Sequence, residues 1–540
     1  MKHFINYSVC IGLLLLTSCQ KDFLNRQPLD AYSNSSLWTD SSDAAAALNG
    51  VYAGQNSWAS DNASGWADGF LVNYMDVASD NAYSEFYWEG FQDFGNGLVT
   101  PSDPNADDLW SPCYTTIAKC NFFLGNVGVT PMDSSAKLQM IGQVRFIRAY
   151  QYFWLTTLFG DAVLDTTTQT PQQANTAVRT PKAAVVKFEL REFAAAANYL
   201  PISYPASQQG QITKGAALAL KMRIELFEND YTDCVADAQQ IMNMGIYSLY
   251  PSYSGLFRIQ NEGNSEDILD VQYKENDHPN GTLGVMLPTS LGGWESISPL
   301  QSLVDNYETI TGKPITDPTS GYDSTQPYKN RDPRLLATIL VPGASYGGEI
   351  YDPLNHSSVD YYTNYGGSKS LYLVKKFTSY LSDFDNIWNT GLDMPLIRYA
   401  EVLLSYAEAK IELGQIDASV YNAIDQVRVR AGLPPTDQSV YNSQTTLRTL
   451  VRRERRSEFA MEGLRWFDVQ RWKIGPQVMQ GATYGGKLGT VNDTTGHLTL
   501  TGPNTFVENR LFDPAKNYLW PIPQAQINID RNLTQNPGYN

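Results

Sequence analysis

The chain has 540 residues, 42% of them hydrophobic, and a formal net charge of −17 at pH 7. This length and composition allow a substantial buried core, and no Pro- or Ser-rich linker marks a boundary between separate domains. The acidic balance is strongest from Gln27 to Ala118, a stretch with thirteen acids and no Lys, Arg or His. Such a surface repels polyanions, so we expect no nucleic-acid partner.

The first eighteen residues have the features of a secretory signal. Lys2 and His3 precede a short apolar run, residues 11–16, and small residues follow before Cys19. The run is too short to span a bilayer. The sequence LTSC resembles a bacterial lipobox, which implies cleavage before Cys19 and lipidation of that residue. An ordinary signal peptide that happens to contain a cysteine is the alternative. A lipidated Cys19 would anchor the mature chain to a membrane through its acyl chains.

The other cysteines and the histidines give no metal-binding pattern. Cys113, Cys120 and Cys234 are an odd number without the spacing of a disulfide framework, so we predict buried thiols. The histidines of the mature chain stand apart from any cluster of possible ligands, so zinc is not expected. The sequence indicates neither a metal site nor a cofactor.

Apolar residues recur at three- and four-residue spacing in several long segments, so the sequence predicts a mainly α-helical protein. The predicted helices are residues 109–127, 138–161 and 181–201, a pair within 214–245, and a second pair within 398–434. Gly160 is expected to end the second helix, and Pro181 to occupy the first helical position of the third. The two pairs resemble tetratricopeptide units, which we expect to form a scaffold rather than a continuous solenoid.

The segment from Arg452 to Trp472, RRERRSEFAMEGLRWFDVQRW, contains six arginines and four acids. On one continuous helix its opposite charges would follow each other at i+3 spacing, where they pair. That series is Glu462, Arg465, Asp468 and Arg471. A nucleic-acid-binding face needs charges of one sign, so we predict a scaffold helix that is docked by its aromatic residues.

Long tracts rich in Gly, Tyr, Asn and Asp lie between the predicted helices, at residues 50–105, 275–390 and 475–515. Ordered loops of this length are usually functional. The sequence contains no GxSxG, HExxH, P-loop or EF-hand pattern. A glycosidase-like pair of carboxylates stays open, because the separation that it requires is spatial.

Ten segments resemble, in order, the SusD/RagB nutrient-binding lipoproteins of the Bacteroidetes outer membrane. They include FLNRQPLD after the lipobox, ALNGVY, RFIRAYQYFWLTTLFGD, YKNRDPRL, LIRYAEVLLSYAEAKIELG and YLWPIPQAQINIDRNLTQNPGY. The resemblance implies a mainly α, SusD-like fold, in which tetratricopeptide-like helix pairs form a scaffold with long, partly irregular insertions. It implies a single globule over residues 19–540, with an N-terminal part of about 20–230 and a C-terminal part of about 231–540.

The resemblance also implies a function. Proteins of this family sit on the cell surface through a lipid anchor in the outer membrane, bind an oligosaccharide, and pass it to a SusC-like TonB-dependent transporter. They are binding proteins, not enzymes. We therefore expect this protein to capture a glycan, in particular a neutral plant or microbial β-glycan, because the acidic N-terminal tract disfavours anionic ligands. A RagB-like peptide-binding lipoprotein and a surface glycoside hydrolase are the alternatives.

Exposed aromatic planes flanked by polar groups are suited to sugar rings, so the aromatic-rich stretch from Trp58 to Phe94 is the first candidate site. From it we expect contacts by Trp66, Asp80, Asn81, Tyr83, Phe86, Tyr87 and Trp88, while most other rings there are core. The loop from Gln272 to Trp294 offers Tyr273, His278 and Trp294, of which Trp294 has an equal claim to a structural role. A third group contains Tyr361, together with Tyr351, Tyr362, Tyr365 and Trp388.

Overall fold

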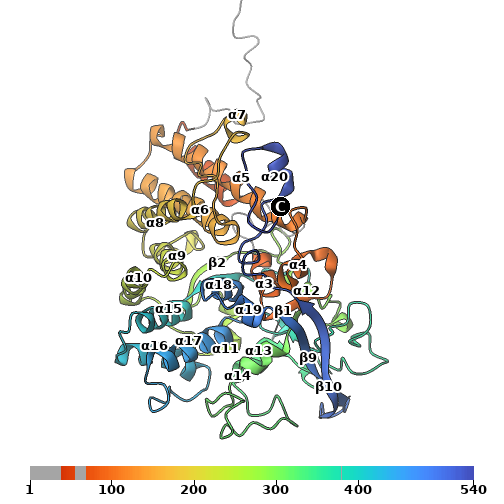
Figure 1. The fold of residues 1–540 in the computed structure, drawn as a ribbon. Coiled ribbons are helices and arrows are strands. Elements are labelled where there is room, and N and C mark those ends of the chain that lie inside the picture. Colours follow the sequence, from red (N-terminus) through yellow and green to blue (C-terminus); the bar gives the residue numbers. More distant parts are fainter. Residues whose placement is uncertain (1–37, 55–68, 379, 540) are drawn as a thin grey trace, which may run out of the picture.

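The computed structural model describes residues 38–54, 69–378 and 380–539, and it is predominantly helical (Figure 1). The predicted signal peptide, Cys19 and Trp66 lie outside the described residues. In the part of the chain that is described, no helix is both long and apolar enough to cross a bilayer.

The first long helices lie where the apolar spacing predicts them. α5 (Pro104–Asn126) begins a few residues earlier than expected, after an N-cap aspartate. α6 (Ser134–Phe159) ends at Gly160, whose φ of 78° suits a residue without a Cβ. α8 (Lys182–Tyr199) begins one residue later than predicted, because Pro181 is its N-cap rather than its first helical residue.

Two antiparallel helix pairs extend this scaffold. α9 (Lys214–Phe227) and α10 (Tyr231–Asn243) form the first, and α15 (Tyr399–Glu412) and α16 (Ala418–Arg430) form the second. α10 packs against α15, which also contacts α17 (Gln444–Glu458). Figure 1 shows these helices as one stack that runs from α5 and α6 down to α16. The mainly α-helical scaffold is therefore confirmed.

The shorter helices lie between and around the scaffold. They are α2 (Ser41–Tyr52), α3 (Gly69–Val77), α4 (Phe91–Asn96), α7 (Pro171–Ala174), α11 (Tyr253–Leu256), α12 (Thr282–Met286), α13 (Gln301–Asn306), α14 (Pro333–Thr338), α18 (Arg465–Arg471), α19 (Gly475–Val478) and α20 (Gln524–Ile529). The tract 50–105, which the sequence suggests is a loop, thus contains α3 and α4, and most of its residues from Val72 to Gly95 are buried.

The strands form five antiparallel two-stranded sheets. They pair β1 (Ala82–Ser84) with β3 (Ile297–Pro299), β2 (Asp267–Val271) with β8 (Met394–Arg398), β4 (Ile339–Leu340) with β7 (Leu373–Val374), β5 (Ser345–Tyr346) with β6 (Glu349–Ile350), and β9 (Gly481–Val491) with β10 (Leu498–Arg510). The long β9–β10 hairpin corrects the expectation of a loop at 475–515. Its many glycines and three irregularities in register obscure the two-residue alternation that would have revealed it.

The Arg452–Trp472 segment is not one helix. α17 ends at Glu458, and α18 begins only at Arg465. Between them Met461 and Gly463 have positive φ values of 65° and 75°. A Cβ on Gly463 would lie 2.4 Å from the Val72 carbonyl oxygen, so glycine is required there by space as well as by conformation.

This break overturns the predicted series of i+3 pairs. Asp468 and Arg471, which share α18, do pair at 2.8 Å. Glu462 lies in the turn and pairs with Arg398 instead, at 2.6 Å. Arg465 pairs with Asp80, at 2.7 Å. The charged residues of this segment therefore pair with distant parts of the chain and hold them to the scaffold. They do not form a series of pairs along one helix.

Glu458 is the centre of a buried network of ion pairs. Its side chain has no exposed surface, and it accepts hydrogen bonds from Arg398 at 2.7 Å and Arg334 at 2.9 Å. It also pairs with Arg430. The network continues through Glu454–Arg334, Glu454–Arg428, Glu308–Arg428, Glu462–Lys376, Glu266–Arg398 and Glu266–Arg430. Burial opposes ionisation of Glu458, but the surrounding arginines outweigh it and hold its pKa far below the usual range.

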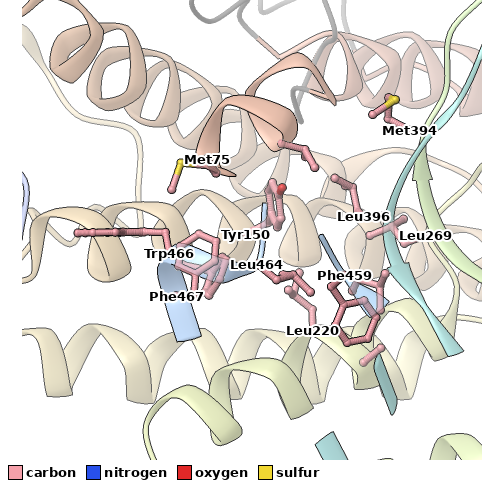
Figure 2. Close-up of a cluster of buried hydrophobic side chains, with 14 of the residues drawn as sticks. Met75, Tyr150, Leu220, Leu269, Met394, Leu396, Phe459, Leu464, Trp466 and Phe467 are labelled. Carbon is pink, nitrogen blue, oxygen red and sulfur yellow. The ribbon is translucent and has the colours of Figure 1, made fainter. Parts of the chain in front are cut away.

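The apolar residues of the Arg452–Trp472 segment pack into the main hydrophobic core. Figure 2 shows this cluster, with Phe459, Leu464, Trp466 and Phe467 near Met75, Tyr150, Leu220, Leu269, Met394 and Leu396. These partners come from α3, α6, α9, β2 and β8. One segment thus contributes both apolar and ionic contacts to the centre of the molecule, as a scaffold element does.

We predict that Glu458→Gln lowers the free energy of unfolding by about 3–5 kcal/mol, because it leaves three buried guanidinium groups without their shared carboxylate. Urea unfolding followed by circular dichroism measures this change.

Asp277→Asn is the matched control, because the Lys274–Asp277 pair that it breaks is largely exposed to solvent. The control is expected to unfold at the same urea concentration as the unmodified protein. Equal stability of the Glu458 variant and the control would show that the buried network does not hold the fold together.

Candidate functional site

Exposed aromatic rings gather on one part of the described surface. Among the described residues, six aromatic side chains are exposed: Tyr87 (80%), Trp88 (49%), Trp294 (48%), Tyr365 (84%), Tyr484 and Phe506. The last two are cross-strand partners on the β9–β10 hairpin. The first four lie in three parts of the chain: the turn at 86–88, position 294, and the segment 353–367. We call these three parts together the aromatic surface.

The first two segments leave the same small sheet at the same end. β1 and β3 are antiparallel, and Ser84 pairs with Ile297 in the last register position. One residue further, the Glu85 amide donates to the Ser296 carbonyl oxygen at 3.2 Å. The chain therefore enters the 86–88 turn beside Trp294, although the two segments are two hundred residues apart in sequence.

Glu295 fixes the third segment to the second. Its side chain is fully buried, and its carboxylate oxygens accept hydrogen bonds from the amides of Thr289 and Ser368, each at 3.0 Å. Its φ of 54° is unusual for a residue with a side chain, and such strain persists only where the surroundings hold it. Burial, together with the nearby Asp360 carboxylate, outweighs the two amide hydrogen bonds and raises the pKa of Glu295 to about 8.

The rings of the aromatic surface stack on a buried base. Phe86 is only 7% exposed and lies 4.3 Å, centroid to centroid, from Trp88. Tyr365 lies nearly parallel to Trp88, with centroids 6.2 Å apart, and Tyr87 meets Trp88 edge-on. Phe86 therefore supports the exposed rings rather than presenting a face of its own, which corrects its expected role as a direct ligand contact.

Trp294 has a second aromatic neighbour. Its ring centroid lies 4.7 Å from that of Trp388, which is half-buried and whose indole nitrogen donates to the Gly292 carbonyl oxygen at 3.3 Å. The exposed position of Trp294 leaves its ring free to meet a ligand. Tyr361 is half-buried and packs on His356, with centroids 4.3 Å apart.

His278 is exposed on a short turn next to this group. The Asn276 side-chain oxygen in that turn accepts a hydrogen bond from the side-chain amide of Asn389, adjacent to Trp388, at 2.7 Å. The structure thus brings the His278 turn to the segment that carries Trp388, but no contact joins the His278 side chain to the aromatic rings among the described interactions.

Two polar residues expected to contact a ligand belong to the scaffold instead. Asp80 is 4% exposed and pairs with Arg465 and Arg456, at 2.7 and 2.9 Å. Burial opposes its ionisation, but these arginines outweigh burial and lower its pKa to about 2. Asn81 is fully buried, and its side-chain amide donates to Asp76 at 2.6 Å. Their expected role as ligand contacts is corrected, because both side chains are used inside the fold.

Two tyrosines require the same correction. Tyr83 is 1% exposed, and its hydroxyl donates to Glu85 and accepts from the Lys369 amide. Tyr273 is also buried, in the main hydrophobic cluster. Tyr351, a companion in the third predicted group, is buried as well. All three residues of β1 are buried, so Tyr83 lies inside, and the sequence alone did not indicate that this short strand is covered on both faces.

A cavity of about 340 Å³ adjoins the aromatic surface and was not indicated by the sequence. Its charged lining residues are Glu349, Asp352, Asp360 and Asp493. Glu349, Asp352 and Asp360 lie in one stretch of the chain, but Asp493 comes from the turn between β9 and β10, so no local motif could have revealed the whole group. No group of three or more His, Cys, Asp or Glu side chains is placed to hold a metal ion within the described ranges.

Comparisons with known proteins agree with this architecture. A family model described as "SusD family" matches residues 255–539, and one described as "Starch-binding associating with outer membrane" matches residues 24–226. A SusD-like protein P2 of Formosa agariphila is 23% identical, over 99% of both chains.

Solved structures show the same fold. A SusD-like carbohydrate-binding protein of Bacteroides fragilis is 30% identical, with a TM-score of 0.82 over 92% of this chain and 99% of its own. A laminarin-binding SusD-like protein has a TM-score of 0.69 at 23% identity, over 93% of this chain and all of its own. The family model covers more than half of the sequence, and the relatives match it from end to end, so the chain belongs to the SusD family.

Proposed function

We propose that this protein is a surface-exposed lipoprotein of the outer membrane that captures an oligo- or polysaccharide and delivers it to a SusC-like TonB-dependent transporter. The observation that carries the proposal is the aromatic surface, where Tyr87, Trp88, Trp294 and Tyr365 are exposed on three segments in mutual contact. Exposed rings cover the apolar C–H faces of sugars, and adjacent polar groups bind the hydroxyls. The names of the starch-binding family model and of the carbohydrate-binding relative support the same class of ligand.

A neutral β-glycan is the ligand that best suits this surface. Separate planar rings suit the faces of an extended chain of sugars better than a compact ligand. The chain has a formal net charge of −17, and such a charge repels an anionic polysaccharide. The name of the laminarin-binding SusD-like protein, which shares this fold, supports a glycan ligand.

The size of the rings predicts weak binding. Covering one sugar face removes ~50 Å² of apolar surface, which contributes roughly 1–1.5 kcal/mol. Three such contacts contribute about 4 kcal/mol before hydrogen bonds are added and before the cost of immobilising the ligand is subtracted. The corresponding affinity is roughly micromolar to millimolar. Weak binding suits a protein that must release its ligand to a transporter.

Trp88→Ala and Trp294→Ala are each expected to weaken glycan binding about fivefold to tenfold, because each removes one stacking face. Isothermal titration with the bound oligosaccharide measures the change. The melting temperature should stay the same, because both side chains are about half exposed.

Tyr484→Ala is the matched control, since its ring is equally exposed but lies on the β9–β10 hairpin outside the aromatic surface. It should bind like the unmodified protein. If the control loses affinity while the two tryptophan variants keep it, the binding site lies on the hairpin and our assignment is wrong.

Native affinity electrophoresis through gels that contain neutral or acidic polysaccharides tests the ligand class. We expect retardation by a neutral β-glycan such as laminarin, xylan, xyloglucan or glucomannan, and none by pectate or sulfated glycans. Retardation by an acidic polysaccharide alone would contradict the charge argument. If no polysaccharide retards the protein and short peptides bind it, a RagB-like peptide-binding function replaces the proposal.

Cys19→Ala is expected to release the protein from the membrane fraction, because it removes the residue that would carry the acyl chains. Fractionation of expressing cells, with detection of the protein in each fraction, measures this. Cys120→Ala is the control, because Cys120 is a buried thiol of α5. Equal membrane association of both variants would exclude the lipid anchor.

A further inference from the structure

The 340 Å³ cavity beside the aromatic surface is built from three parts of the chain. They are the loop after α12, the β5–β6 hairpin with the segment that follows it, and the turn between β9 and β10. At ~30 Å³ for each water molecule, the cavity has room for about ten waters, so a sugar unit or a side chain can enter.

The charges of this cavity are all of one sign. Glu349, Asp352, Asp360 and Asp493 line it, and the described lining residues include no Lys, Arg or His. Both carboxylate oxygens of Asp360 accept hydrogen bonds from Ser290, at 2.6 and 2.7 Å. Partial burial raises the pKa of Asp352, and repulsion from Asp493 adds to the shift. Asp352 and Asp493 both line this cavity, and the described residues around it supply no cation to pair with them.

A buried hydroxyl gives a second, independent indication of a ligand. Tyr351 is only 4% exposed and lines the cavity, and its hydroxyl has no hydrogen-bond partner among the described residues. Glu295, which lies outside the cavity lining, acts most strongly on this hydroxyl, and the cavity acids Asp360 and Asp352 act on it as well. A buried polar atom normally has a partner, so this hydroxyl is available to a bound molecule.

The cavity borders the aromatic surface, because its lining residues Asn355, Ser358 and Asp360 belong to the 353–367 segment. Asp360 precedes Tyr361 directly, and the cavity residue Leu291 precedes Gly292, which accepts the hydrogen bond of Trp388. A sugar chain lying across Trp294 and Tyr361 can therefore place one unit in the cavity.

We propose that this cavity is a subsite for a sugar unit that carries a protonated amine, such as glucosamine, within or at the end of a glycan held by the aromatic surface. The amine would donate hydrogen bonds to Asp352 and Asp493, and a ring hydroxyl would pair with Tyr351. Such charge-assisted hydrogen bonds are stronger than neutral ones, and they remove the repulsion between the carboxylates. This inference rests on the proposed glycan-binding function and adds to it the charge of one sugar unit.

The test compares two ligands that differ only in acetylation. The mature protein is titrated with a β-1,4-linked glucosamine tetrasaccharide and with its fully N-acetylated form. We expect the amine form to bind at least tenfold more tightly at 50 mM NaCl, and this preference to shrink at 500 mM NaCl because salt screens the attraction. Equal affinities, or tighter binding of the acetylated form, would overturn the proposal.

Substitutions in the cavity then test which residues cause the tighter binding of the amine form. The double variant Asp352→Asn, Asp493→Asn should reduce the preference for the amine about tenfold, and Tyr351→Phe should weaken binding of both ligands to a smaller extent. Asp437→Asn, which removes one acid from the loop between α16 and α17, is the control and should leave the preference unchanged. A preference that survives in the double variant would place the amine elsewhere and overturn the assignment.

Two further measurements separate this inference from the proposed function. If Trp88→Ala weakens binding of a neutral glycan while the amine gives no advantage, only the inference fails. If neither neutral nor amine-bearing glycans bind, both fail together. A lysine-containing peptide that binds through Asp352 and Asp493, more tightly than the glucosamine tetrasaccharide, would assign the cavity to a peptide ligand and overturn the sugar assignment.

Discussion

The pairing of buried charges around α17 and α18 is the constraint on which the rest of this structure depends. Glu458 neutralises arginines from α14, β8 and α16, so it holds together elements that are far apart in the sequence. Arg456 and Arg465 extend the same principle to Asp80, which lies two residues before β1. Because β1 leads directly into the 86–88 turn, the ionic scaffold sets the position from which Trp88 reaches the surface. A buried charge without a partner is costly, so these pairs permit one arrangement of the elements.

The aromatic surface is assembled by a second buried group. Glu295 holds a strained backbone next to Trp294 and accepts hydrogen bonds from Thr289, six residues earlier, and from Ser368, which directly follows the 353–367 segment. Its conformation is stabilised by these bonds, since a free chain would avoid it. The exposed rings therefore stand on a rigid base, although they come from segments without long regular structure. Pre-ordered rings lose little entropy when a sugar binds, which partly offsets their small individual contributions.

Separate parts of the molecule thus serve stability and recognition. The helical stack and its ion pairs contain few exposed rings, whereas the irregular insertions present four of the six exposed aromatic side chains that the structure describes. Aromatic residues in the insertions can be substituted without disturbing the helices that carry the insertions. The acidic cavity lies among the same insertions, so it belongs to the part of the protein that determines the ligand.

The sequence by itself determined the long helices, the end of α6 at Gly160, and the family, because these depend on residues close together in the chain. It also indicated Trp88 and Trp294 among the candidate ligand contacts. Only the tertiary structure decided that Tyr83, Asp80 and Tyr273 are buried, that the arginine-rich segment breaks at Met461 and Gly463, and that four acids share one cavity. Exposure and charge pairing depend on contacts between residues hundreds of positions apart, and no local pattern specifies those contacts.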